Sequence, residues 1–383
     1  MLIFLTYIFV SQKISCNLLT KSDNFKMKKN YSIAFLFLFL NTFYGQKNSS
    51  FADSIRIKYK IPELAYAVVS SDSIFEINAL GYQRYNSSYK AKIDDKFRLG
   101  SITKTVTSYI ATLLVKEGKI KWDTKFFDLY PELKAKSNPE TYNFTLQDFL
   151  TFRAKLGIWS YGNETPTPKE IKGNDQQQRY EFIAWFFQQN TVLEKQDIYW
   201  SNPGYVAAGL MLEKATGKTY ENLVQELGKS LKVDFDFGQP NLKDKNQPWG
   251  HDENLKPEKP TLNYKLNWLS SAGNINVSLP DFCKFTQMQL QGLSGKSKLL
   301  SAEEFHNMHY GLPEYSFGWE SENNEKSHLK YSFHNGNPGT FLAKVYLCKS
   351  IDKAFILFAN VQSEQADKGL MLLLAKLQEQ YGG

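Results

Sequence analysis

Cysteine and histidine are both scarce in this chain of 383 residues, which contains three cysteines and five histidines. So few cysteines exclude a small scaffold that is held together by several disulfide bonds. Two of them, Cys283 and Cys348, lie in the apolar segments "DFCKF" and "KVYLCKS". We therefore predict that both are buried free thiols.

The sequence also lacks a glycine-rich phosphate loop, a dinucleotide fingerprint and a cluster of metal ligands, so we expect neither a cofactor nor a metal. A strong excess of positive charge is missing as well. The formal net charge is +7, but residues 1–45 carry five lysines and one aspartate, which leaves +3 for the rest. That charge is too small to predict a nucleic-acid partner.

Residues 27–45 have the features of a secretory signal peptide. Lys28 and Lys29 form a basic start, residues 33–40 are apolar, and Gly45 is a small residue near the end. The apolar run is too short to remain as a membrane span. We therefore predict a periplasmic or secreted protein whose mature chain has no transmembrane anchor.

The first 26 residues have no evident role, and we take Met27 as the true start of translation. This divides the chain into an N-terminal extension with signal peptide, residues 1–45, and one domain, residues 46–383. An alternative interpretation makes the first 16 residues a lipoprotein signal with an acylated Cys16. That segment lacks a basic start, however, and Lys13 interrupts its apolar part.

Strand patterns occur at both ends of the domain, and helical patterns lie between them. The expected strands are residues 64–70, 73–82, 340–348 and 353–361. Residues 120–245 are rich in helical patterns, and a last helix is expected near 364–380. Terminal strands that pair with each other would form one antiparallel sheet, into which the helical middle is inserted as a second lobe. The expected fold class is α+β.

Ser101 and Lys104 stand out within "RLGSITKTVTSYIATLLVKEGKI". A Ser-x-x-Lys pattern alone is weak, since it occurs four times here, but this copy follows Gly100 and opens a predicted helix. Residues three apart lie on one helical face, so a desolvated lysine could take the proton of the serine. The simpler alternative is that Ser101 caps the helix and Lys104 is solvated.

This segment resembles the first motif of the serine β-lactamase and penicillin-binding-protein superfamily, and it is most similar to the class C β-lactamase-related serine hydrolase branch. Further segments resemble that branch in the same order and cover about residues 50–380. They are "IPELAYAVV" (61–69), "FTLQDFLTFRAKLG" (144–157), "WSNPGYVAAGLMLEKATGKTYENLV" (200–224), "SSAGNINVSLPDFCKF" (270–285), "YSFGWE" (315–320) and "FHNGNPGTF" (333–341). The resemblance implies a β-lactamase/transpeptidase-like fold, with the antiparallel sheet flanked by terminal helices.

The resemblance also implies roles for individual residues. Ser101 would be the nucleophile and Lys104 its proton acceptor. His334 would donate a hydrogen bond to the substrate from a strand at the edge of the cleft, and Gly336 would let the substrate approach closely. The amides of Ser101 and Asn337 would form the oxyanion hole.

The second motif departs from the family pattern, which has tyrosine two residues before Asn202. Here that residue is Trp200, whose indole N–H can donate but cannot act as a base. Three hypotheses follow: Lys104 is the sole base, the neighbouring Tyr199 takes over, or the protein is a binder with impaired catalysis. Asn202 itself matches and can donate to a substrate carbonyl.

The resemblance thus implies a monomeric serine hydrolase that needs no cofactor. It would attack an amide or ester carbonyl in a D-amino-acid peptide, a small ester or a β-lactam, and form an acyl-enzyme on Ser101. The alternative is a non-catalytic protein of the same fold that binds peptidoglycan-like peptides or another small ligand. Trp200 is the residue that keeps this alternative open.

Overall fold

The computed structural model describes residues 48–325 and 327–382. The predicted signal peptide, Met27 and Cys16 lie outside the described residues. From Ser49 onward the chain clusters into one compact unit. Among the described helices, none combines the length and the apolar character that a membrane span requires.

A six-stranded antiparallel sheet forms the centre of this unit, in the order β2-β1-β9-β8-β7-β6. The strands are β1 (Glu63–Val69), β2 (Ile74–Gly81), β6 (Glu320–Asn323), β7 (Lys330–Gly336), β8 (Leu342–Cys348) and β9 (Lys353–Ala359). The pairing of β1 with β9 joins the two ends of the domain. The prediction that terminal strands form one sheet is therefore confirmed.

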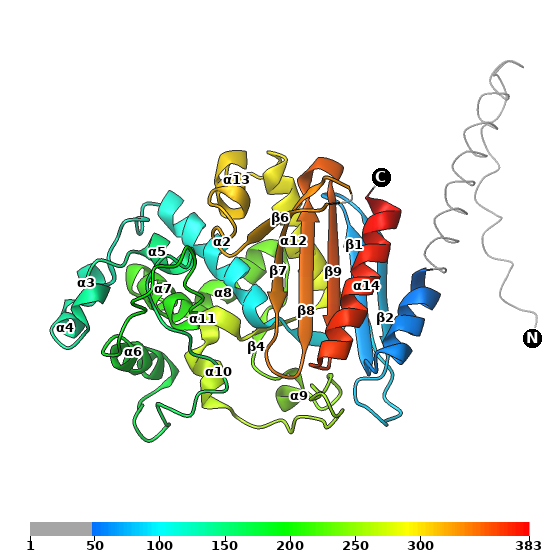
Figure 1. The fold of residues 1–383 in the computed structure, drawn as a ribbon, viewed down its shortest axis with the longest axis horizontal. Coiled ribbons are helices and arrows are strands. Elements are labelled where there is room, and N and C mark those ends of the chain that lie inside the picture. Colours follow the sequence, from blue (N-terminus) through cyan, green and yellow to red (C-terminus); the bar gives the residue numbers. More distant parts are fainter. Residues whose placement is uncertain (1–47, 326, 383) are drawn as a thin grey trace, which may run out of the picture. The chain divides into compact units, whose positions relative to one another are not determined.

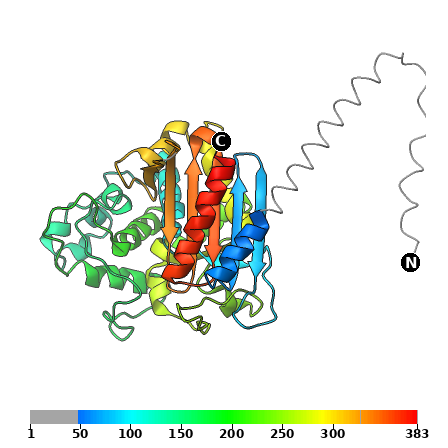
Figure 2. The same ribbon diagram turned by 45° about the vertical axis from the view of Figure 1, so that its right-hand side comes forward.

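Helices cover both faces of this sheet. Figure 2 shows α14 (Glu364–Tyr381) crossing one face beside the helical residues 49–58. On this face Tyr66 and Val68 of β1 pack with Leu370 and Leu373 of α14. The alternate residues of β1 belong to the core on the opposite face, formed with α2 (Thr103–Lys116) and α12 (Leu279–Leu293). Every residue of β1 is buried, as expected for a strand covered on both sides.

The middle of the chain forms the helical part seen at the left of Figure 1. Its helices are α3 (Phe126–Leu129), α4 (Pro131–Lys134), α5 (Leu146–Leu150), α6 (Asp175–Phe186), α7 (Asn202–Thr216) and α8 (Tyr220–Leu231), while the short α9 (Pro240–Lys243) lies below the large sheet in this view. Local signals start several of them. Thr145 and Asp148 form a capping box at α5, and Asn174 and Gln177 form one at α6.

A second, three-stranded sheet was not predicted. It has the order β3-β5-β4, with β3 (Lys96–Arg98), β4 (Asp236–Phe237) and β5 (Ile275–Ser278). Three further helices follow the helical part: α10 (Tyr264–Trp268), α11 (Ser270–Gly273) and α13 (Ala302–Tyr310). Cys283 and Cys348 are buried free thiols, which confirms the prediction made for them.

Candidate active site

Ser101 lies in a short 3-10 turn, η1 (Gly100–Ile102), between β3 and α2. Gly100 has a φ of +52°, and a Cβ added to it would lie 2.9 Å from the backbone nitrogen of Asn337. Only glycine fits this conformation and this close approach without strain. The N-cap of α2 is Ile102, and no side chain caps that helix. The Ser101 hydroxyl is therefore not a helix cap.

The amine of Lys104 lies at the centre of the site. Its Nζ is 3.0 Å from Ser101 Oγ, 2.9 Å from Asn202 Oδ1 and 2.8 Å from the carbonyl oxygen of Ala272. The Lys104 residue is only 2% exposed. The structure thus brings the nucleophile, its proton acceptor and the asparagine of the second motif into one contact group.

These three contacts suit a neutral amine. A neutral lysine has two N–H groups and one lone pair, whereas its ammonium form has three N–H groups. The carbonyl of Ala272 can only accept, and so can Asn202 Oδ1, whose orientation is fixed because Asn202 Nδ2 donates to the carbonyl of Trp159 at 3.0 Å. The two N–H groups of a neutral Lys104 are then used, and its lone pair faces Ser101 Oγ. The ammonium form can donate to all three partners, so a proton can move between Ser101 and Lys104 without loss of a hydrogen bond.

Burial makes this proton transfer accessible near neutral pH. Removal of water from the ammonium lowers the pKa of Lys104 from its ordinary value of 10.5 to about 7. A large fraction of the amine is therefore unprotonated at pH 7, and it can accept the serine proton.

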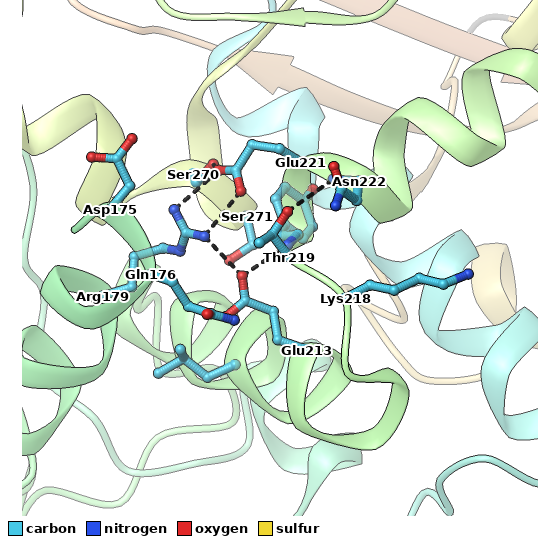
Figure 3. Close-up of polar contacts among 12 residues, drawn as sticks. Asp175, Gln176, Arg179, Glu213, Lys218, Thr219, Glu221, Asn222, Ser270 and Ser271 are labelled. Carbon is cyan, nitrogen blue, oxygen red and sulfur yellow. Dashed lines mark hydrogen bonds and ion pairs between the residues drawn. The ribbon is translucent and has the colours of Figure 1, made fainter.

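A largely buried polar network, shown in Figure 3, is bonded to α11, the short helix that contains Ala272. The hydroxyl of Ser270 donates to Glu221 at 2.8 Å. The guanidinium of Arg179 lies between that carboxylate and the carboxylate of Glu213, at 3.0 and 2.7 Å. These contacts connect α11, which contains Ala272, to α6, α7 and α8.

Neighbouring groups hold the rest of α11. Thr107 Oγ1 donates to the carbonyl of Ser271 at 2.7 Å, and the hydroxyl of Ser271 donates to the carbonyl of Tyr205 at 2.9 Å. The hydroxyl of Tyr161 donates to the carbonyl of Gly273 at 3.2 Å. Sequence reasoning missed Tyr161, because a single tyrosine in a loop carries no pattern that marks it.

The end of β7 packs directly against the turn that carries Ser101. A Cβ on Gly336 would lie 1.9 Å from the carbonyl oxygen of Leu99 and 3.4 Å from the amide nitrogen of Ser101. Strand β6 lies outside β7 but pairs with it only as far as Phe333, so the next three residues are at an open edge. This geometry brings Asn337 beside η1, where its amide and that of Ser101 can serve as the two donors of an oxyanion hole.

His334 lies on β7, and its residue is 4% exposed. Its Nδ1 is 2.9 Å from the carbonyl oxygen of Asn335, so this nitrogen must carry the hydrogen. Burial, together with the charge of nearby Lys104, lowers the pKa of His334 to about 3, and the ring is neutral at pH 7. Nε2 then presents a lone pair and has no partner among the described residues. The geometry gives the ring an acceptor role in place of the donor role that we expected.

Trp200 and Tyr199 point to opposite sides of an extended segment. Tyr199 is 4% exposed, and its hydroxyl accepts a hydrogen bond from the amide of Gln196 at 3.0 Å. Trp200 is 45% exposed and lies two residues before Asn202, on the same side. Trp200 is connected to the contact group through Tyr315. The hydroxyl of Tyr315 is 2.9 Å from that of Tyr205, and Lys104 Nζ lies 5.5 Å from the ring centroid of Tyr205. The phenol of Tyr199 lies outside that group.

Trp200 rests on two aromatic residues that sequence analysis did not assign to the site. Its ring centroid is 5.1 Å from that of Phe152 and 5.4 Å from that of Tyr315. Tyr315 in turn meets the ring of His334 edge-on at 6.0 Å. Phe152 lies within "FTLQDFLTFRAKLG" (144–157), and Tyr315 opens "YSFGWE" (315–320); their positions within these segments were the available signals.

Comparisons with known proteins identify the family and the fold. The model of the family described as "Beta-lactamase" matches residues 46–379. The chain belongs to the Beta-lactamase family. Membership supports the general class of serine hydrolases that work through an acyl-enzyme, and it confirms the resemblance inferred from the motifs.

The curated relatives are distant. "Protein flp" of Staphylococcus aureus strain NCTC 8325 / PS 47 is 23% identical over 323 residues, which are 81% of this chain and 62% of the relative. The same protein of strain COL gives the same figures. The chain thus spans less than two thirds of the length of the curated relatives it matches.

Two solved structures show the same fold. The octameric penicillin-binding protein homologue from Pyrococcus abyssi aligns with a TM-score of 0.72 at 18% identity, over 87% of this chain and 77% of the other. A crystal structure of SurE with D-Leu aligns with a TM-score of 0.69 at 18% identity, over 88% and 75%. These likenesses support the β-lactamase/transpeptidase-like fold class.

Proposed function

We propose that this protein is an exported serine hydrolase that attacks an amide or ester carbonyl and forms an acyl-enzyme on Ser101. The observation that carries the proposal is the contact group of Lys104, whose partners leave its lone pair facing Ser101 Oγ. Export is supported by the features of residues 27–45 in the sequence.

Ser101, Lys104 and water can account for every bond and proton in the proposed reaction. Ser101 Oγ forms a bond to the carbonyl carbon while its proton passes to Lys104. The bond to the leaving group breaks, and the leaving group takes the proton from Lys104. Water then attacks the acyl carbon, loses a proton to Lys104 and releases Ser101 with its hydrogen restored. The amides of Ser101 and Asn337 would stabilise the oxyanion in both steps.

The test is covalent labelling of the full chain with a fluorophosphonate and with a fluorescent penicillin, read by intact mass and peptide mapping. We expect an adduct on Ser101 from at least one reagent and none on Ser101→Ala, whose unfolding curve should match the wild type. Ser108→Ala is the matched control, since it removes a buried hydroxyl about two turns further along the chain, on α2. An adduct on another residue would move the nucleophile elsewhere.

One observation favours a second function, that of a ligand-binding protein of the same fold. Trp200 occupies the position where the family pattern has tyrosine, and its indole is 45% exposed beside the site. A binder would give no adduct with either reagent. Its affinity for a peptidoglycan-like peptide would fall in Trp200→Ala and stay unchanged in Lys104→Ala.

A further inference from the structure

An aromatic surface lies beside the contact group of Lys104, and we name Phe152, Trp200 and Tyr315 the aromatic shelf. Two of these residues support the ring of Trp200 from inside the protein: Phe152 is 4% exposed and Tyr315 is fully buried. Phe152 has a φ of +58°, which aromatic residues seldom adopt, and its carbonyl accepts from the amide of Tyr199 at 2.8 Å. Trp200 is the member whose face is open to a ligand.

The hydrogen bonding of His334 determines whether a charged substrate group can be bound beside its ring. Its Nδ1–H is used by the carbonyl of Asn335, so the buried Nε2 offers a lone pair. A substrate carboxylate placed there would meet an acceptor instead of a donor, and it would lose its hydration without compensation. A neutral substrate group escapes this cost, and a group with an N–H or O–H would gain a partner.

Three neighbouring cations each have at least one contact away from His334 Nε2. Arg153 donates to the carbonyls of Tyr315 and Pro313. Lys344, which reaches Asn335 on β7, forms an ion pair with Asp367 at 2.8 Å. Arg98, two residues before Gly100, lies 3.7 Å from a carboxylate oxygen of Glu258, and its Nε and Nη2 have no hydrogen-bond partner among the described residues.

Trp200 has an indole where the family pattern has the phenol of tyrosine, and this difference affects how the leaving group can be protonated. An amine is expelled from a tetrahedral intermediate only when its nitrogen is protonated, and a phenol can relay that proton. The indole of Trp200 has an N–H donor and no lone pair to receive a proton, so it cannot relay. Lys104 is then the one proton source in the contact group. An alkoxide or phenoxide is a better leaving group and depends less on that proton.

From these observations we propose that the site is selective for uncharged esters whose leaving alcohol is aromatic or otherwise flat and apolar. That group lies on the open face of Trp200, and substrates whose leaving group carries a carboxylate are disfavoured. This inference rests on the proposed function and names its substrate class. Ser101 takes the acyl group, the ester C–O bond breaks, the alcohol leaves with the proton held by Lys104, and water hydrolyses the acyl-enzyme.

Two matched comparisons test the inference with the full chain. For charge, the substrates are 4-acetoxybenzoate and its methyl ester, which share the aryl acetate bond and differ in the carboxylate. Release of the phenol measures cleavage of that bond, because the methyl ester contains a second ester bond. We expect the wild type to have a kcat/KM about tenfold or more higher for the methyl ester, because an unpaired carboxylate is costly in a buried site. His334→Lys puts a cation where the carboxylate would lie. In this variant kcat/KM for the methyl ester should exceed kcat/KM for 4-acetoxybenzoate by less than in the wild type, or should fall below it.

For the shelf, the substrates are phenyl acetate and 2,2,2-trifluoroethyl acetate. Trp200→Ala should lower kcat/KM for the phenyl ester by about 3- to 10-fold, the usual size of one aromatic contact, and change the trifluoroethyl ester less than about twofold. Tyr89→Ala, which removes an aromatic ring that is 61% exposed in the β2–β3 connection, is the control and should change neither rate. The kcat/KM for acetanilide should be far lower than that for phenyl acetate, and Trp200→Tyr should reduce the ratio between these two kcat/KM values.

The results separate this inference from the proposed function. Labelling of Ser101 together with equal rates for the two acetoxybenzoates, or for ester and anilide, would overturn the substrate class and leave the acyl-enzyme mechanism standing. Absence of both labelling and ester hydrolysis would overturn both. Each variant is first checked by its unfolding curve, and a variant that does not fold is replaced by His334→Gln or by Trp200→Leu, which also lacks an aromatic ring, and the same directions are expected.

Discussion

Asn202 Oδ1 and Lys104 Nζ lie 2.9 Å apart although the two residues are 98 positions apart in the sequence. Because Trp159 holds the other end of the amide, this oxygen is a fixed, uncharged acceptor for one N–H of Lys104. An uncharged partner leaves the pKa of Lys104 near 7, whereas a carboxylate at the same place would stabilise the ammonium.

The first prediction concerns this pair. Acylation requires neutral Lys104, so kcat/KM of the wild type for an aryl ester should rise with pH through about 7 and then level off. Asn202→Asp should move this rise upward by about one pH unit or more, because an opposite charge at hydrogen-bond distance favours the protonated amine. Asn143→Asp, on an exposed residue, is the control. An unmoved profile in Asn202→Asp would show that another group is the base.

The second prediction concerns the contact of β7 with the Ser101 turn. Gly336→Ala would place a Cβ 1.9 Å from the carbonyl oxygen of Leu99, so the strand must shift and carry the Asn337 amide with it. We expect kcat to fall about 100-fold or more, as is usual when an oxyanion donor is lost, with a smaller change in KM. Gly118→Ala has the strain of a φ of +70° but no neighbour within 4 Å, and it should lower stability without this loss of kcat.

The sequence predicted the parts of the site that depend on local pattern. Ser101 and Lys104 are one helical turn apart, and the strands that form β1, β2, β8 and β9 have clear apolar patterns. The small sheet was missed because strands of two to four residues are too short to show a period.

The details that depend on distant contacts were out of reach. The orientation of the Asn202 amide depends on Trp159, and the tautomer of His334 depends on how its ring meets the Asn335 carbonyl. The side to which Trp200 and Tyr199 point follows from the extended conformation before α7. None of these is encoded in residue type or spacing alone.

The third prediction concerns the buried network of Figure 3. Arg179→Met would leave the carboxylate of Glu213, whose side chain is 2% exposed, without its cation. We expect a loss of about 3–5 kcal/mol in the free energy of unfolding, measured by urea denaturation. Adding Glu213→Gln should recover part of this loss, since the buried charge is then removed. The exposed pair of Lys218 and Glu226 provides the control, and Lys218→Met should cost about 1 kcal/mol or less. Equal losses at both sites would contradict the interpretation.

The fourth prediction concerns export. If residues 27–45 are a signal peptide, the protein that accumulates in the native host should begin near Gln46 and be found outside the cytoplasm. N-terminal sequencing of the purified protein and cell fractionation check this. Replacing Lys28 and Lys29 with glutamate should retain the precursor inside the cell. A mature chain that begins at Met1 or Met27 is the contrary result.

The last prediction concerns a buried carboxyl pair outside the site. Glu63 is fully buried, and burial together with the neighbouring charge of Asp95 raises its pKa well above its ordinary value of 4.5. Asp95 accepts hydrogen bonds from Gln83 Nε2 and from the amide of Lys92, at 2.6 and 2.7 Å, which favour its ionised form. The proton of the pair is therefore held by Glu63.

The sign of the effect on stability follows from this. Above pH 4.5 the unfolded chain releases the proton that folded Glu63 retains, so this group makes unfolding easier as the pH rises toward its folded pKa. The slope from one such proton is about 1.4 kcal/mol per pH unit. Glu63→Gln cannot titrate and should remove that slope, so the variant should gain stability relative to the wild type as the pH rises from 5 toward the raised pKa of folded Glu63. Urea denaturation at each pH measures the difference, with Glu253→Gln on an exposed residue as control. A constant difference across this range would mean that Glu63 is already ionised in the folded protein.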